Sequence, residues 1–113
     1  KMVNKHYKPL LIDSIKATAD IEQHRFIGFD GKHCTAGAKA LGVSDVAIEK
    51  GQYAPVALFG VLLVEAGGTI TAGDEVSSDE NGKAVKAIEK ALVNGYAQDS
   101  GVVGQEVRIV RGI

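Results

Sequence analysis

The residues best suited to chemistry are one cysteine and three histidines. Cys34 follows His33 directly, whereas His6 and His24 stand apart from them. Adjacent residues on a strand point to opposite faces, so His33 and Cys34 are poorly placed to act as base and nucleophile. Zinc normally takes four ligands in recognisable pairs, which these scattered residues do not offer. We therefore expect a buried thiol, a surface imidazole, no catalytic residue and no metal site.

Acidic and glycine-rich stretches also lack the spacing of a binding site. The pairs Asp74-Glu75 and Asp79-Glu80 flank a turn, but they lack the alternation of ligands found in a calcium loop. A solvated hairpin tip is the simpler interpretation. Gly28, Gly31 and Gly37 do not form a dinucleotide-binding fingerprint. The sequence therefore predicts no cofactor.

Composition indicates one folded domain of short strands. The 113 residues are 45% hydrophobic and 24% charged, as in ordinary globular domains. Fourteen glycines and no tryptophan favour tight turns over a helical bundle. A net charge of −1 argues against a nucleic-acid partner, and the single cysteine suits assembly in the cytosol. The longest apolar run, residues 54–64, contains Pro and Gly and is too short to cross a membrane.

Sequence landmarks recur along the chain at a constant spacing. Gly42 recurs as Gly95, and Gly51-Gln52 recurs as Gly104-Gln105; 42 to 95 and 51 to 104 are both 53 residues. Similarity at a fixed spacing indicates copies of one structural unit. We therefore predict a single β domain, residues 25–113, that contains two related units, residues 25–60 and 75–112.

Within each unit the hydrophobic pattern is that of short strands. In residues 106–111, Val107 and Ile109 fall on one face of a strand and charged residues on the other, and residues 56–64 have the pattern of a buried strand. The pairs Asp30-Gly31 and Asn81-Gly82 suit hairpin turns. Because two copies are too few for an open solenoid, we expect them to close on each other. The predicted fold is all-β, a pseudo-two-fold barrel or sandwich of about seven or eight short strands.

Residues 82–92 fit two structures. Val85, Ile88 and Leu92 form a stripe with helical spacing, which favours one short helix. A strand is the alternative. The matching stretch of the first unit, residues 33–41, is also rich in alanine and favours a short helix or an irregular loop.

Residues 1–24 precede the first unit and have no evident counterpart in the second. We expect them to form an extended N-terminal arm, since such a segment gains little from folding back on a small barrel and can grip a neighbour by strand addition. A first edge strand with a frayed tip is the alternative. The predicted contacts with a partner protein or a neighbouring subunit are Tyr7, Pro9, Leu10, Leu11 and Ile12.

Turn and strand phrases from about residue 21 onward follow an ordered pattern. The most informative is Ile70-Thr71-Ala72-Gly73-Asp74-Glu75-Val76, followed by Asn81-Gly82-Lys83. The others are Phe29-Asp30-Gly31, Leu41-Gly42-Val43, Gly51-Gln52, Val56-Ala57-Leu58-Phe59-Gly60, Asn94-Gly95-Tyr96-Ala97 and Gly104-Gln105-Glu106-Val107-Arg108-Ile109. Over about four-fifths of its length the chain resembles the capsid cement, or head decoration, proteins of tailed bacteriophages.

The resemblance implies a β-barrel protein that binds the outside of the mature phage head at junctions between major capsid subunits, often as a dimer or trimer. It implies a virion location, assembly in the host cytoplasm, and neither catalytic residues nor a cofactor. Many copies on a lattice act together, so modest affinity at each site suffices. Two alternatives are a tail or baseplate component and a lipoyl or biotinyl carrier. A carrier would be modified at a hairpin lysine such as Lys83.

Overall fold

This computed structural model describes residues 7–113, which contain eight β-strands and no helix. One sheet contains the order β2-β3-β4-β8-β7-β5-β6, and β1 pairs with β4 beside this path. The expected all-β, barrel-like fold is confirmed. The strands are β1 (Lys8–Lys16), β2 (Phe26–Ile27), β3 (Gly42–Ser44), β4 (Tyr53–Glu65), β5 (Glu75–Ser78), β6 (Ala84–Lys86), β7 (Gly95–Ala97) and β8 (Glu106–Arg111).

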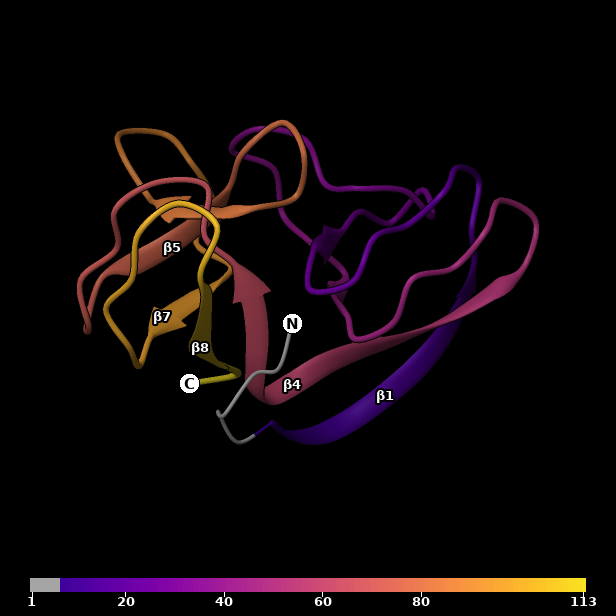
Figure 1. The fold of residues 1–113 in the computed structure, drawn as a ribbon, viewed down its shortest axis with the longest axis horizontal. Coiled ribbons are helices and arrows are strands. Elements are labelled where there is room, and N and C mark those ends of the chain that lie inside the picture. Colours follow the sequence, from indigo (N-terminus) through magenta and orange to yellow (C-terminus); the bar gives the residue numbers. More distant parts are fainter. Residues whose placement is uncertain (1–6) are drawn as a thin grey trace.

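The long strand β4 joins the two sides of the molecule. Its first half lies beside β1, and after a bend its second half continues beside β8 (Figure 1). Gly60 lies at the bend with φ 118°, and a Cβ atom there would collide with the carbonyl oxygen of Lys8. Only glycine combines this backbone conformation with so close an approach. We call residues 8–59, which begin with β1, the first repeat, and residues 60–111 the second repeat.

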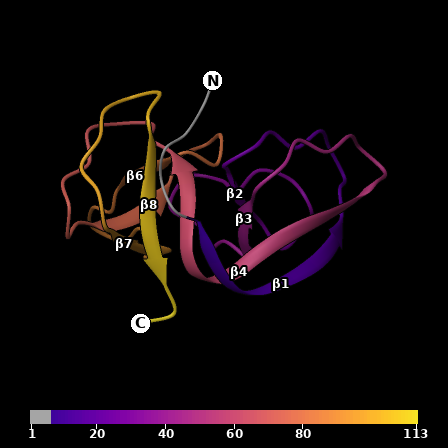
Figure 2. The same cartoon turned by 60° about the horizontal axis from the view of Figure 1, so that its bottom comes forward.

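Strand pairings recur in the two repeats with the same register. Val43 of β3 pairs with Ala57 of β4, and Tyr96 of β7 pairs with Val110 of β8. The distances 43 to 96 and 57 to 110 are both 53 residues, which is the spacing of the sequence landmarks. The pseudo-two-fold relation therefore extends to individual backbone pairs, and Figure 2 shows the two repeats side by side.

Strand β1 takes part in this relation. Ile15 pairs with Ala54, and Val64 pairs with Val107; 15 to 64 is 49 residues and 54 to 107 is 53. The expectation that the N-terminal segment has no counterpart is therefore wrong, because the second half of β4 is its counterpart. Residues 8–16 form a paired edge strand, the alternative that the sequence left open. Residues 1–6 of the expected arm lie outside the described residues.

The shift from 49 to 53 residues arises in one hairpin of each repeat. Ile27 bridges His33 in the first repeat, and Val76 pairs with Lys86 in the second; 27 to 33 is six residues and 76 to 86 is ten. The hairpin of the second repeat is therefore four residues longer. Both turns lie where Asp-Gly and Asn-Gly predicted them.

Residues 82–92 contain β6 and an irregular turn where the hydrophobic stripe favours a helix. Glu89 has φ 48°, a left-handed conformation that interrupts a right-handed helix. Ile88 is exposed, so the stripe is not a buried face. The helix alternative is wrong because pairing of β6 with β5 overrides local propensity. Residues 33–41 form the irregular loop that was the alternative there.

The Gly-Gln pairs found in the sequence form matching turns. Gly51 and Gly104 have φ of 93° and 88°. The side-chain Oε1 of Gln52 accepts the Glu49 N–H at 3.3 Å, and that of Gln105 accepts the equivalent N–H, from Val102, at 2.9 Å. Each pair closes its loop directly before the last strand of its repeat.

The buried residues form a large and a small cluster. The large one spans both repeats, and the small one lies under β1 and the first half of β4. The large cluster contains Phe26, Cys34, Ala40, Val43, Ala57, Leu62, Val64, Ala66, Ile70, Val76, Ala84, Ala97, Val107 and Ile109. The small cluster contains Ala17, Ile21, Ile27, Ala54 and Val56.

Candidate protein-binding surface

Strand β1 presents an apolar edge to solvent. It pairs with β4 along one side, and no strand among residues 7–113 pairs with its other side. Leu10 is 85% exposed, and Leu11 and Ile12 are each 50% exposed. An exposed apolar edge strand is a ready template for pairing with another chain.

A local irregularity explains why three consecutive apolar residues are exposed. The register with β4 shifts between Pro9 and Leu11 and again between Leu11 and Ile12. Such a bulge breaks the alternation that would otherwise bury every second side chain. Pro9 has no N–H, so it also suits an edge strand rather than a central one. Of the five predicted contacts, the structure places Leu10, Leu11 and Ile12 together on the surface.

Tyr7 has a different environment from the other four predicted contacts. Its ring packs against the large core cluster, and its hydroxyl donates a hydrogen bond of 3.3 Å to Oδ2 of Asp45. Burial, reinforced by the Asp45 carboxylate, raises the pKa of Tyr7 to about 12. This tyrosine therefore anchors the start of β1 to the core, and its hydroxyl is already bonded.

The surface continues from β1 onto residues that the sequence did not single out. Leu10, Phe59, Val61, Val110 and Ile113 line one apolar groove of about 580 Å³. Phe59 belongs to a run with the pattern of a buried strand, yet it is exposed. The adjacent glycine, at the bend of β4, was the available signal that the strand changes direction here.

The cysteine and histidine pair does not form a catalytic arrangement. Cys34 is buried, its Sγ donates to the carbonyl oxygen of Ala38 at 3.5 Å, and burial raises its pKa, which disfavours the nucleophilic thiolate. His33 is partly buried rather than on the surface. Its Nε2 accepts the N–H of Glu22 at 2.9 Å, so the imidazole has a structural role.

The acidic residues shape turns. Asp79 Oδ1 accepts the N–H groups of Asn81 at 2.8 Å and Lys83 at 2.9 Å, which closes the β5–β6 hairpin. Lys83 Nζ lies 3.4 Å from Oε2 of Glu65. Residues 7–113 contain no group of three or more His, Cys, Asp or Glu side chains that could hold a metal ion. They also include no helix long and apolar enough to cross a membrane.

Comparison with known proteins identifies the family. A solved structure with the same fold is the N-terminal base of the head fiber protein gp8.5 of bacteriophage phi29; the TM-score is 0.75 and the identity 23%, over 90% of this chain and 93% of that one. No match was found among curated protein sequences. Residues 7–111 match the family described as phage cement protein. The chain therefore belongs to the phage cement protein family and has a structural role associated with the phage capsid.

Proposed function

We propose that this protein decorates the outer surface of a phage head and reinforces the shell, with the major capsid protein as its partner. Three consecutive exposed apolar residues, Leu10, Leu11 and Ile12, carry the proposal; they lie on an edge strand whose second side pairs with no described strand. A head-fiber base with the same fold supports attachment to a head. On this proposal the chain acts by protein contact alone and binds no nucleic acid.

The physical basis is burial of the β1 edge against the shell. Full burial would contribute roughly 1.5 to 3 kcal/mol for Leu10 and roughly half as much for Ile12, which is already half-buried. A strand of the partner that pairs with β1 would add main-chain hydrogen bonds. Because identical sites repeat over the lattice, such contacts reinforce the whole shell. The chain is expected to act as a dimer or trimer on the virion and to join the head in the host cytoplasm.

The first experiment is quantitative mass spectrometry of purified particles. A decoration protein should be present within a few-fold of the number of major capsid subunits. A handful of copies per particle would contradict head decoration and favour a tail or baseplate component.

A second experiment tests the surface by substitution. Deleting the segment would remove β1 from the sheet, so point changes are better suited. Leu10→Gln together with Ile12→Thr should lower affinity for shells at least about tenfold, because both apolar contacts are lost. The control is Val103→Thr, since Val103 is 64% exposed in a turn of the second repeat. Equal binding by both variants and the wild type would remove β1 as the contact surface.

A further inference from the structure

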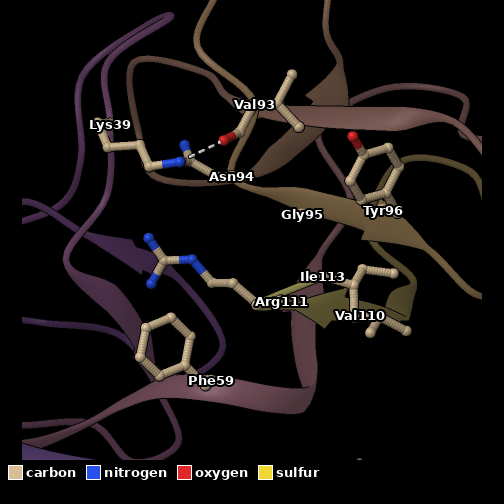
Figure 3. A pocket seen from close by; sticks show the side chains of 10 residues that line it. Lys39, Phe59, Val93, Asn94, Gly95, Tyr96, Val110, Arg111 and Ile113 are labelled. Atoms are coloured by element: carbon tan, nitrogen blue, oxygen red, sulfur yellow. Dashed lines mark hydrogen bonds between the residues drawn. The ribbon is translucent and has the colours of Figure 1, made fainter.

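A second pocket adjoins the apolar groove and is lined by two cations. It has a volume of about 340 Å³, and Phe59, Tyr96, Val110 and Ile113 form much of its wall. Lys39 and Arg111 reach it from opposite sides, as Figure 3 shows. No aspartate or glutamate lines it.

Arg111 differs from the other two arginines of the chain. Arg25 lies 3.4 Å from Glu65, and Arg108 lies 2.8 Å from Asp99. The Arg111 guanidinium instead donates to three main-chain carbonyl oxygens: those of Leu41 at 2.6 Å, Leu58 at 3.1 Å and Ala40. Within residues 7–113 it forms no ion pair with a carboxylate.

Lys39, like Arg111, is bonded to main-chain carbonyl oxygen and not to a described carboxylate. Its Nζ donates to the carbonyl oxygen of Val93 at 2.7 Å, and it forms no ion pair with a described carboxylate. Carbonyl oxygens satisfy N–H groups, but they carry no formal negative charge to pair with these two cations. Burial accordingly lowers the pKa of Arg111. A negatively charged group in the pocket would interact favourably with both side chains.

The repeat relation shows that the repeated unit does not carry cations at both copies of these positions. With the spacing of 53 residues, Arg111 corresponds to Leu58 and Lys39 corresponds to Leu92. Both counterparts are leucines, so the backbone of the repeat accommodates apolar side chains at these positions. The cationic pair is therefore a feature of this pocket and not of the repeated unit.

We propose that the pocket formed by Lys39 and Arg111 receives an acidic side chain of the capsid shell when the protein binds. This inference rests on the proposed decoration function and adds the chemistry of the contact. Leu10 and Phe59 share the apolar groove, and Phe59 also lines the cationic pocket, so the pocket continues the β1 surface. The partner segment therefore presents a carboxylate beside apolar residues.

The test compares binding of the full-length chain and its variants to purified shells that lack the protein, at low and high salt. Wild-type affinity should fall as salt rises, because ion pairs at an interface rim are screened. Lys39→Glu should weaken binding at least about tenfold at low salt, and Lys39→Gln by less. Lys50→Glu makes the same charge change in an exposed loop of the first repeat and should leave affinity unchanged.

A further variant addresses Arg111, the less exposed of the two cationic residues. Arg111→Leu introduces the residue found at its repeat counterpart, and it should also weaken shell binding while its thermal unfolding shows that the barrel is intact. Wild-type affinity retained by Lys39→Glu at both salt concentrations would overturn the carboxylate pocket and leave the decoration function standing. Loss of self-association with unchanged shell binding would assign the pocket to a second copy and overturn the proposal. No wild-type binding would overturn both.

Discussion

The two equivalent edge strands, β1 and the second half of β4, have the same place in their repeats but different burial. Asp13 and Ser14 of β1 are exposed, whereas their counterparts, Leu62 and Leu63, are buried. Tyr7, directly before β1, packs against the large cluster, which contains Leu62. No described strand covers the free side of β1. One repeat therefore completes its core within the chain, and the other leaves its first strand available for a partner.

This difference explains how a duplicated fold exposes one edge strand without additional elements. Arg25, paired with Glu65 at 3.4 Å, holds the first repeat against the buried edge of the second. Position 16, the counterpart of Glu65, is an exposed lysine, so the exposed edge does not carry the carboxylate that Arg25 pairs with. The surface thus arises from a sequence difference at equivalent backbone positions.

The largest effect is expected at the junction between the repeats. Gly60→Ala should cost roughly 3 to 5 kcal/mol of unfolding free energy, since a left-handed conformation and a clash add together. Its Cβ would lie 2.8 Å from the Leu10 nitrogen, and backbone atoms cannot move aside as a flexible side chain can. Denaturant unfolding monitored by circular dichroism measures this loss.

The matched control is Gly51→Ala. Gly51 also has a positive φ, but a Cβ there meets no atom within 4 Å. This variant should cost only about 1 to 2 kcal/mol, from backbone strain alone. Equal losses in the two variants would show that close approach of β1 to the bend does not require glycine.

A second prediction compares the cores at equivalent positions. Ile21 and Ile70 are both buried; Ile21 donates its N–H to Ile48, and Ile70 donates its N–H to Gly101, each at 2.8 Å. Either change to alanine should cost roughly 2 to 5 kcal/mol. Ile70→Ala should cost about 1 kcal/mol more, because the Ile48 side chain can relax into the space left by Ile21 whereas Gly101 has none to offer.

Urea unfolding of the two alanine variants measures this difference. A larger loss at Ile21 would mean that the small cluster tolerates cavities less well than the large one. That outcome would contradict the argument that the Ile48 side chain relaxes into the space left by Ile21.

Turns were predictable from the sequence because their residue requirements are local. Gly51-Gln52 and Gly104-Gln105 mark loops whose glycine needs a positive φ, and their spacing revealed the repeat. Strand β1 was harder, because its partner β4 lies far along the chain and its counterpart lies within a continuous strand. Inside β4, Gly60 marks the boundary between the repeats, but no turn pair such as Asp-Gly or Asn-Gly accompanies it.

The candidate site was predictable only where its residues are neighbours in the sequence. Leu10, Leu11 and Ile12 stand out as an apolar run in a polar segment. Lys39 and Arg111 did not, because the two residues are far apart in sequence and only the fold brings them to one pocket. Phe59 was missed because its exposure depends on the bend of β4, which is a tertiary feature.

The smallest expected effect is a pH dependence confined to the first repeat. His33 accepts a hydrogen bond from the Glu22 N–H in its neutral form. Burial, and next the nearby Arg25 charge, lower its pKa below 6.5, while the Glu22 carboxylate opposes them. Below pH 6.5 the unfolded chain therefore binds a proton more readily than the folded one. The free energy of unfolding consequently decreases as the pH is lowered. The equivalent position of the second repeat holds an exposed lysine, Lys86.

Substitution of His33 by glutamine isolates this contribution. His33→Gln keeps a side-chain acceptor for the Glu22 N–H but does not titrate. The loss of unfolding free energy between pH 7.5 and pH 5 should therefore be smaller in the variant than in the wild type. Carboxylate titrations occur in both proteins and cancel in the difference. Equal losses in the two proteins would show that protonation of His33 does not destabilise the fold. Amide exchange that speeds up equally in both repeats on acidification would show that the pH dependence is not confined to the first repeat.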